Sequence, residues 1–164
     1  MVIAVKVFLK RDTSGLYSRF EILDDRGRLK YTVRGKNTPS GEYVRIRDKD
    51  EAVVCKIRRL GFSALSMFAI RADDETVRLN IAVAGAVATV RFRGISFCIR
   101  GDVLTGNYDI LDADNSVVCT VYKDFAKRTL TLKMSSEERE LFCIGAAVCI
   151  DSLSVNTTPA LQMT

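Results

Sequence analysis

Residues 141–150 read Leu141-Phe-Cys-Ile-Gly-Ala-Ala-Val-Cys-Ile150, and this stretch decides which kind of fold the chain can form. It follows Ser135-Ser-Glu-Glu138, the spacing of a helix capping box, with acidic residues where a helix N-terminus favours negative charge. A helix that is apolar on every side must be buried on every side. The sequence therefore predicts a buried helix over 135–151, whose small central residues let other segments approach closely.

Upstream of this helix, the chain consists of short segments in which β-branched and aromatic residues alternate with polar ones. About a dozen such strands are typical of a barrel or a sandwich, because these architectures leave few strand edges exposed. The natural place for the helix is inside a closed barrel, and a helix packed against one sheet face is the alternative. The expected strands are 2–9, 19–23, 29–34, 42–47, 52–58, 66–71, 76–83, 87–92, 97–100, 108–111, 117–122 and 129–134.

The sequence pattern of one β-hairpin occurs three times along the chain. Residues 46–57 align without gaps on residues 110–121, and residues 22–33 form a third copy. Each copy has an inward aliphatic residue, an aspartate two residues later, a polar turn and a returning strand. We expect Asp24, Asp48 and Asp112 to accept hydrogen bonds from the amides of their turns, which explains these carboxylates without a calcium loop.

The ordered series of motifs resembles the LURP-one-related family, which shares the tubby C-terminal-like fold with tubby proteins and phospholipid scramblases. The motifs are Phe20-x-Ile22-x-Asp24, Tyr31-x-Val33-x-Gly35-Lys36, Ile46-x-Asp48, Val53-Val-Cys-Lys-Ile57, Ile99-x-Gly101-Asp102, Tyr108-Asp-Ile110, Val117-Val118 and the apolar helix to Asp151. The resemblance implies a mainly β fold, a twelve-stranded closed β-barrel enclosing a hydrophobic C-terminal α-helix. Tubby proteins bind phosphoinositides through basic surface residues, but none of their functional motifs stands in this sequence.

The composition excludes several kinds of catalysis. The chain has 164 residues and no histidine, so Ser-His, Cys-His and His-ligated metal mechanisms are ruled out. The five cysteines, Cys55, Cys98, Cys119, Cys143 and Cys149, form no CxxC motif and mostly lie in apolar runs, so we expect buried thiols in a reducing compartment. No phosphate loop occurs either. The sequence predicts a protein that is not an enzyme and has no cofactor or metal site.

Positive charge is concentrated in the first part of the chain. Residues 1–71 hold sixteen basic and eight acidic side chains, a net +8, whereas residues 72–164 hold nine and twelve, a net −3. Alternation puts Arg45 and Arg47 on the outward face of one strand, and Lys56 and Arg58 on the outward face of its hairpin partner. Nearby we place Arg34, Lys36 and Arg59. This face is either a docking site for anionic headgroups or a solvated face that prevents strand mispairing. If it is a docking site, the expected ligand-binding residues are Arg45, Arg47, Lys56, Arg58, Arg34 and Lys36.

The expected partners follow from this face. We predict a non-enzymatic binding module for anionic phospholipid at a membrane surface, or for a similar phosphorylated ligand; the alternative is a protein-interaction scaffold with no small ligand. A ligand cavity inside the barrel is disfavoured because the helix should fill it, and nucleic acid because exposed aromatics and a free helix are absent. No signal peptide or membrane-spanning segment is recognisable, so we expect a cytoplasmic protein, peripheral at a membrane, with one domain over 1–155 and a tail over 156–164.

Overall fold

The described part of the chain consists of twelve strands and one helix, and the strands were expected from the alternating pattern. The computed structural model describes residues 2–12, 19–38, 41–60 and 65–162. The strands begin and end within four residues of the expected limits, and the largest difference is at the end of the third one. They are β1 (Val5–Asp12), β2 (Arg19–Leu23), β3 (Leu29–Thr38), β4 (Gly41–Asp48), β5 (Val53–Arg59), β6 (Leu65–Ala72), β7 (Glu75–Ala84), β8 (Val87–Arg93), β9 (Cys98–Asp102), β10 (Asn107–Leu111), β11 (Val117–Asp124) and β12 (Thr129–Met134), followed by α1 (Glu140–Gln162).

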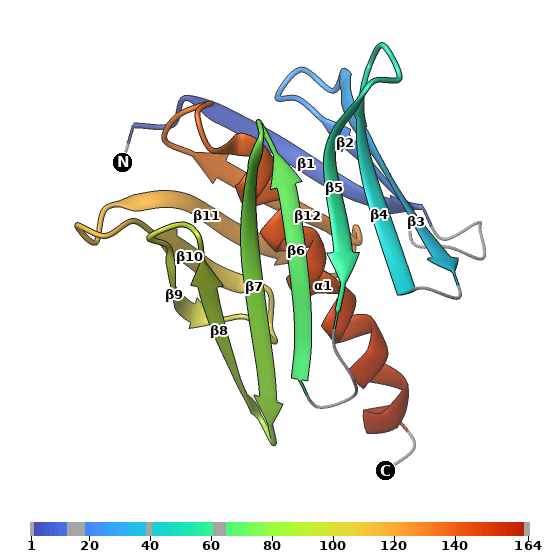
Figure 1. Cartoon of the computed structure of the whole chain (residues 1–164), viewed down its shortest axis with the longest axis vertical. Helices are drawn as coiled ribbons and strands as arrows, with labels where there is room; N and C mark the ends of the chain where they lie inside the picture. The colour runs from blue at the N-terminus through green and yellow to red at the C-terminus, as the bar shows by residue number, and fades with distance from the viewer. Residues whose placement is uncertain (1, 13–18, 39–40, 61–64, 163–164) are drawn as a thin grey trace.

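The strands form one antiparallel sheet that curls around the helix into a nearly closed barrel (Figure 1). The order is β8-β7-β6-β5-β4-β3-β2-β1-β12-β11-β10-β9, so strands that are adjacent in sequence pair with each other, except β8 and β9, and β1 pairs with β12. In the part of the chain that the structure describes, the ladder is interrupted only between β8 and β9. The mainly β barrel with a C-terminal helix is therefore confirmed.

The three repeated hairpins share one turn geometry. Asp24 Oδ1 accepts hydrogen bonds from the amides of Arg26 and Arg28, and Asp48 Oδ1 accepts them from Asp50 and Ala52. The fifth residue after the aliphatic one has a left-handed backbone in every copy, with φ of 77°, 65° and 64°, and a register shift lies beside each turn. These residues are Gly27, Glu51 and Asn115. The predicted role of the aspartates as turn acceptors is confirmed; in the third copy Asp112 accepts from Ala113.

The helix is enclosed by the sheet and not laid on one face of it. Every residue from Phe142 to Asp151 is buried, with at most 7% of any of them exposed. α1 packs closest to β5, β6 and β7. Gly145 faces this wall: a Cβ atom at this position would lie 3.0 Å from Ile70 Cγ2 and 3.6 Å from Ile57 Cδ1. A small residue at the middle of the helix therefore lets the wall approach, as the sequence predicted.

The expected start of the helix was wrong. α1 begins at Glu140 and not at Ser135, because residues 135–139 form turns and the Ser135–Glu138 capping box is not made. Ser136 Oγ instead accepts a hydrogen bond from the Glu138 amide at 3.3 Å. Glu140 is 6% exposed, and its carboxylate lies 2.5 Å from Lys30 Nζ. The helix thus begins at Glu140, whose carboxylate forms an ion pair with Lys30 on the barrel wall.

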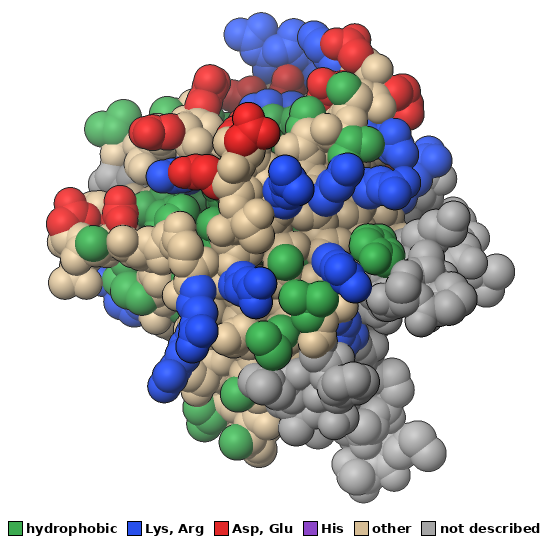
Figure 2. All heavy atoms as spheres, in the orientation of Figure 1, with side chains coloured by type: hydrophobic (Ala, Val, Ile, Leu, Met, Phe, Trp, Pro, Cys, Tyr) green, Lys and Arg blue, Asp and Glu red, His purple; other side chains and the backbone are tan. Residues whose placement is uncertain are grey.

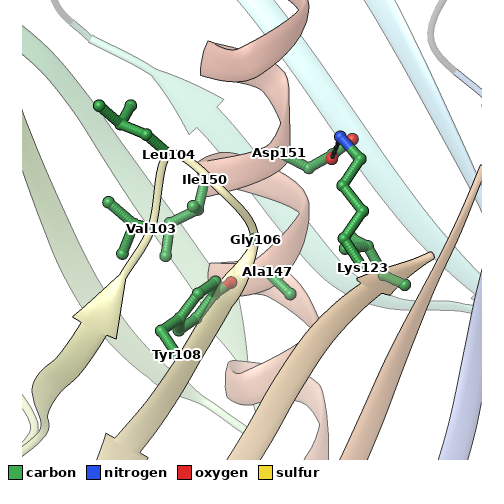
Figure 3. Close-up of a pocket in the computed structure, with 9 residues that line it drawn as sticks. Val103, Leu104, Gly106, Tyr108, Lys123, Ala147, Ile150 and Asp151 are labelled. Carbon is green, nitrogen blue, oxygen red and sulfur yellow. Dashed lines mark hydrogen bonds and ion pairs between the residues drawn. The ribbon is translucent and has the colours of Figure 1, made fainter. Parts of the chain in front are cut away.

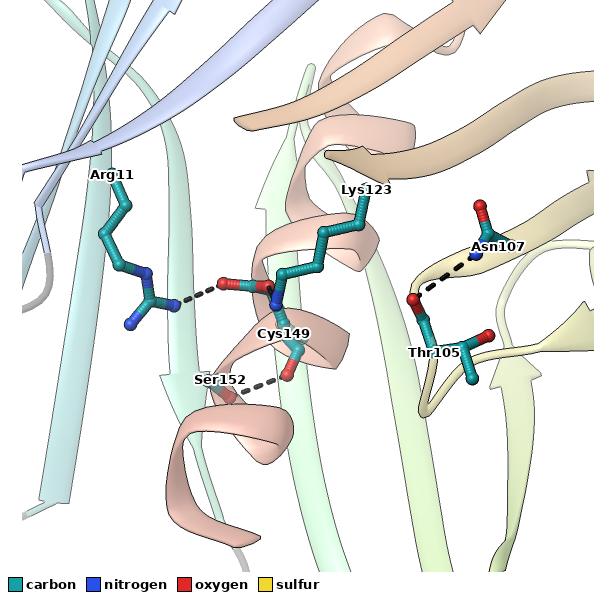
Figure 4. A network of polar contacts seen from close by, with 7 residues as sticks. Arg11, Thr105, Asn107, Lys123, Cys149 and Ser152 are labelled. Atoms are coloured by element: carbon teal, nitrogen blue, oxygen red, sulfur yellow. Dashed lines mark hydrogen bonds and ion pairs between the residues drawn. The ribbon is translucent and has the colours of Figure 1, made fainter. Parts of the chain in front are cut away.

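Asp151 anchors the helix directly after the apolar stretch. Its carboxylate is 6% exposed and forms ion pairs with Arg11 at the end of β1 and with Lys123 on β11, the latter at 3.2 Å (Figure 4). Ser152 adds a hydrogen bond to the Cys149 carbonyl at 2.6 Å. Because a buried carboxylate is stable only when it is paired, α1 is held to β3 at its first residue and to β1 and β11 at its middle.

The five cysteines are free thiols, four of them buried as expected. Cys98 is the exception: it is exposed on β9, at one of the two ends of the sheet. The apolar run around it predicted burial, but Cys98 alternates with the half-buried Ile99 and therefore lies on the outward face of β9.

Candidate basic docking face

Four basic side chains stand in one straight row across four neighbouring strands. The register places Arg34 on β3 opposite Arg45 on β4, Arg45 opposite Lys56 on β5, and Lys56 opposite Arg71 on β6. All four residues are exposed. We call these residues the basic row. Neighbouring strands are about 4.8 Å apart, so the four charges lie within roughly 15 Å on one outer wall of the barrel.

The wall around the basic row carries mainly positive charge. Figure 2 shows Lys and Arg side chains gathered on the face formed by β4 to β8, whereas Asp and Glu side chains gather along the upper rim. Among the described residues, no carboxylate pairs with any member of the basic row. This wall therefore has an uncompensated positive field.

Another part of the barrel surface arranges its charges differently. Across β9 and β10, Arg100 donates to Asp109 at 2.9 Å, and Thr120 on β11 donates to the same carboxylate at 2.7 Å. Burial raises the pKa of Asp109, but the hydrogen bonds from Thr120 and Arg100 outweigh it and hold the pKa below its usual range. Lys10 likewise lies opposite Glu21 across β1 and β2. Side chains of opposite charge therefore face each other elsewhere on this barrel, whereas the basic row places like charges opposite one another.

The neighbouring strands β3, β4 and β5 bring together half of the six residues expected at the site. Arg34, Arg45 and Lys56 are neighbours in the basic row. Arg58 lies in the next row, opposite Tyr43, with its guanidinium 5.6 Å from the centre of the ring. Arg58 is therefore near the row, but part of its charge is directed onto an aromatic face.

The other two expected residues are placed differently. Arg47 is half-buried, and its Nη1 donates to the Glu51 carbonyl at 3.3 Å, so this side chain is tied to the turn. A β-bulge in β5 sets Arg47 opposite Val53, whereas β4 keeps its regular register against β3, with Arg47 opposite Thr32. The Lys36 backbone lies opposite Tyr43, and its side chain lies outside the described residues.

Arg59 and Arg71 show what the sequence reasoning missed. Arg59 is not on the outer wall: it lies opposite the buried Phe68, stacks 5.8 Å from that ring and donates to Ser66 Oγ at 3.2 Å. Arg71 completes the row, and the signal was its outward place in the alternation of β6. Its alignment with Lys56 depends on the pairing of β5 with β6, which no local pattern reveals.

The barrel contains a small cavity in its described part. A cavity of about 10 Å³ lies beside the helix, lined among others by Tyr108, Ala147 and Ile150 and flanked by Lys123 and Asp151 (Figure 3). This is roughly the space that one water molecule needs.

Two of the buried thiols, Cys55 and Cys149, have raised pKa values. Burial raises the pKa of Cys55 to about 12, and burial likewise raises the pKa of Cys149 far above its usual value. An activated cysteine nucleophile requires the opposite shift. Within the described ranges, no group of three or more acidic or cysteine side chains is arranged to hold a metal ion, and no helix is long and apolar enough to cross a bilayer.

Comparison with known proteins assigns the architecture to a family. A family model described as LURP-one-related matches residues 5–151, which includes all twelve strands and the buried part of α1. No curated protein and no solved structure matches the chain significantly.

Proposed function

The chain belongs to the LURP-one-related family, and from this premise we propose that it is a binding module, not an enzyme, that docks on anionic phospholipid membranes through the basic row. The carrying observation is the row itself: Arg34, Arg45, Lys56 and Arg71 stand directly opposite one another with no acidic partner among the described residues. Peripheral attachment of the barrel to a membrane surface follows from the same proposal.

The arrangement of the row supports a ligand more than simple solvation. Like charges directly opposite on paired strands destabilise a sheet by roughly 0.2–1 kcal/mol per pair. A solvated wall gains the same solubility from alternating signs, as Arg100 and Asp109 do in this molecule. Three successive like-charged pairs therefore weaken the fold for no structural benefit, and an anionic surface would convert this repulsion into binding.

The expected affinity follows from the number of charges. A basic residue near an anionic bilayer contributes about 1 kcal/mol, so the four residues contribute about 4 kcal/mol, which corresponds to a dissociation constant of about 1 mM in effective lipid. Such binding is reversible and falls steeply with salt, because exposed charges are screened within about 10 Å at 0.1 M ionic strength. The proposal thus describes a weak, peripheral attachment.

Vesicle co-sedimentation tests this proposal. Purified protein is mixed at low salt with vesicles of phosphatidylcholine alone or with phosphatidylserine added, and the bound fraction is measured. We expect binding only to the phosphatidylserine vesicles, and loss of most of it when all four members of the basic row are replaced by serine. The charge-matched control replaces four exposed basic residues outside the row by serine: Lys10, Arg26, Lys49 and Lys127.

Each result of this experiment has a clear meaning. If the control variant loses as much binding as the row variant, net charge and not the row is responsible, and the proposed site is wrong. If wild-type protein does not bind phosphatidylserine vesicles even at low salt, the lipid function is wrong, and the alternative of a protein scaffold becomes the better hypothesis. A phosphorylated peptide that displaces protein from vesicles would show that the row recognises phosphate itself.

A further inference from the structure

The barrel has an open seam between its two terminal strands. β8 pairs only with β7 and β9 only with β10 in the described part of the chain, although a link of four residues joins β8 to β9. β8 has seven residues and β9 has five, and Figure 1 shows the first half of β8 extending beyond β9. One edge of β8 therefore presents backbone donors and acceptors that no neighbouring strand satisfies.

Burial of the inward side chains decreases toward this seam. On β7 the inward residues Leu79 and Ile81 are 0% and 1% exposed. On β8 the inward residues are only half-buried, and so is Ile99, the inward residue of β9. The half-buried residues of β8 are Ala88, Val90 and Phe92. An added strand along β8 would cover them, so the seam offers apolar burial in addition to backbone hydrogen bonds.

The outward side chains beside the seam are basic. Arg91 and Arg93 alternate on the outer face of β8, and Arg78 on β7 lies directly opposite Arg93. All three are exposed, and no described carboxylate pairs with them. A strand added next to β8 would place its own outward side chains beside these guanidinium groups.

We infer that the seam binds an extended, acidic segment of a partner protein, which adds to the edge of β8 as an antiparallel strand. Its inward side chains would be apolar and would pack over Val90 and Phe92; its outward side chains would be Glu or Asp, facing Arg91 and Arg93. Strand addition supplies affinity through the main chain and specificity through alternate side chains. A second copy of this chain fits poorly, since two paired β8 edges would bring four arginines to one ladder.

A model peptide tests the inference directly. The probe is a fluorescein-labelled, end-capped nine-residue peptide in which valine and glutamate alternate, and binding is measured by fluorescence anisotropy. We expect saturable binding that weakens at least tenfold in the variant Arg91→Glu/Arg93→Glu. That variant should in turn prefer the peptide with lysine in place of glutamate. The matched control, Arg34→Glu/Arg45→Glu in the basic row, should bind the acidic peptide like wild type.

Two further measurements separate strand addition from general charge attraction. Alternate amides of an extended peptide point to opposite edges, so N-methylation of one set should abolish binding while N-methylation of the other set leaves it intact. Hydrogen exchange should slow in β8 and stay unchanged in β5 when the peptide is bound. The inference is overturned if both N-methylated peptides bind equally well, if the basic-row control loses binding as strongly as the β8 variant, or if millimolar peptide does not bind. The vesicle experiment uses different residues, so either proposal can fail alone.

Discussion

Replacing Gly145 by phenylalanine tests the enclosed helix most directly. A Cβ atom at Gly145 would lie 3.0 Å from Ile70 Cγ2 and 3.4 Å from Ile70 Cδ1, whereas unstrained carbon contacts are about 3.5–4.0 Å long. Alanine alone therefore requires the Ile70 methyl group to move by about 0.5 Å. Because alanine also gains about 1 kcal/mol of helix propensity over glycine, we expect Gly145→Ala to be close to neutral.

A phenyl ring cannot be accommodated in the same way. Ile70 and Ile57, which face Gly145, are 0% and 2% exposed, so neither can move into solvent without opening the core. Overpacking typically costs 1–3 kcal/mol, and we expect Gly145→Phe to cost about 3 kcal/mol or more. For a domain of this size, that loss lowers the melting temperature by about 6–12 °C, measured by circular dichroism with urea unfolding as a second method.

A double-mutant cycle shows whether the strain has the stated cause. Ile70→Ala removes the atoms that a residue at position 145 would meet, so Gly145→Phe/Ile70→Ala should be more stable than the sum of the two single losses by at least about 1 kcal/mol. Ile110 on β10 is equally buried but is not among the nearest contacts of Gly145, so Ile110→Ala should be additive with Gly145→Phe. Near-wild-type melting of Gly145→Phe, or additivity with Ile70→Ala, would refute the enclosed-helix geometry.

Three other predictions follow from the ion pairs, the turns and the buried thiols. Asp151→Ala leaves Arg11 and Lys123 without their carboxylate and should cost about 2–3 kcal/mol in urea unfolding; Asp151→Asn should cost less, since it keeps an acceptor. Glu51 has a left-handed φ of 65°, so Glu51→Gly should raise the free energy of unfolding by about 0.5–1 kcal/mol. Gly27 has a similar φ, so Gly27→Ala should lower the free energy of unfolding by a similar amount. If both substitutions changed stability in the same direction, the turn assignment would be wrong. Burial raises the pKa of Cys55 to about 12 from about 9 in the unfolded chain, so its contribution to stability is complete below pH 9 and is lost as the pH rises toward 12. For this thiol, the free energy of unfolding should be about 1.4 kcal/mol lower at pH 10 than at pH 8. Cys55→Ala should remove this part of the pH dependence of the unfolding free energy.

The two proposed surfaces use one physical feature in different ways. Both depend on outward arginines of β3–β8 that have no acidic neighbour among the described residues. The basic row is a flat array of side-chain charges in the middle of a paired sheet, which suits a charged membrane surface. The seam combines charge with an unpaired backbone edge, which suits a polypeptide. The barrel could therefore attach to a membrane with one wall and hold a partner segment at another.

Much of the fold was accessible from local patterns. Alternation of β-branched and polar residues predicted all twelve strands, since side chains of a strand point to opposite faces whatever its neighbours are. The apolar stretch 141–150 predicted a fully buried helix for an equally local reason. The helix start was not predictable in the same way. A capping box at Ser135 competes with burial of Glu140 against Lys30, and Lys30 is distant in sequence.

The candidate site was predictable only in part. Arg45 and Lys56 could be paired from one hairpin, and Arg34 could be placed nearby. The tie of Arg47 to the Glu51 carbonyl was not predictable, because it forms beside a bulge that sets Arg47 opposite Val53. A bulge depends on turn geometry, which the alternation of polar and apolar residues does not encode.

The sequence by itself determined which segments are strands, which segment is the buried helix, and that positive charge lies in residues 1–71. Only the tertiary structure decided that Arg34, Arg45, Lys56 and Arg71 form a straight row, and that the ladder stays open between β8 and β9. The physical reason is range. Periodicity and apolar burial act on neighbouring residues, whereas register and closure depend on how every strand of the barrel is staggered against the next.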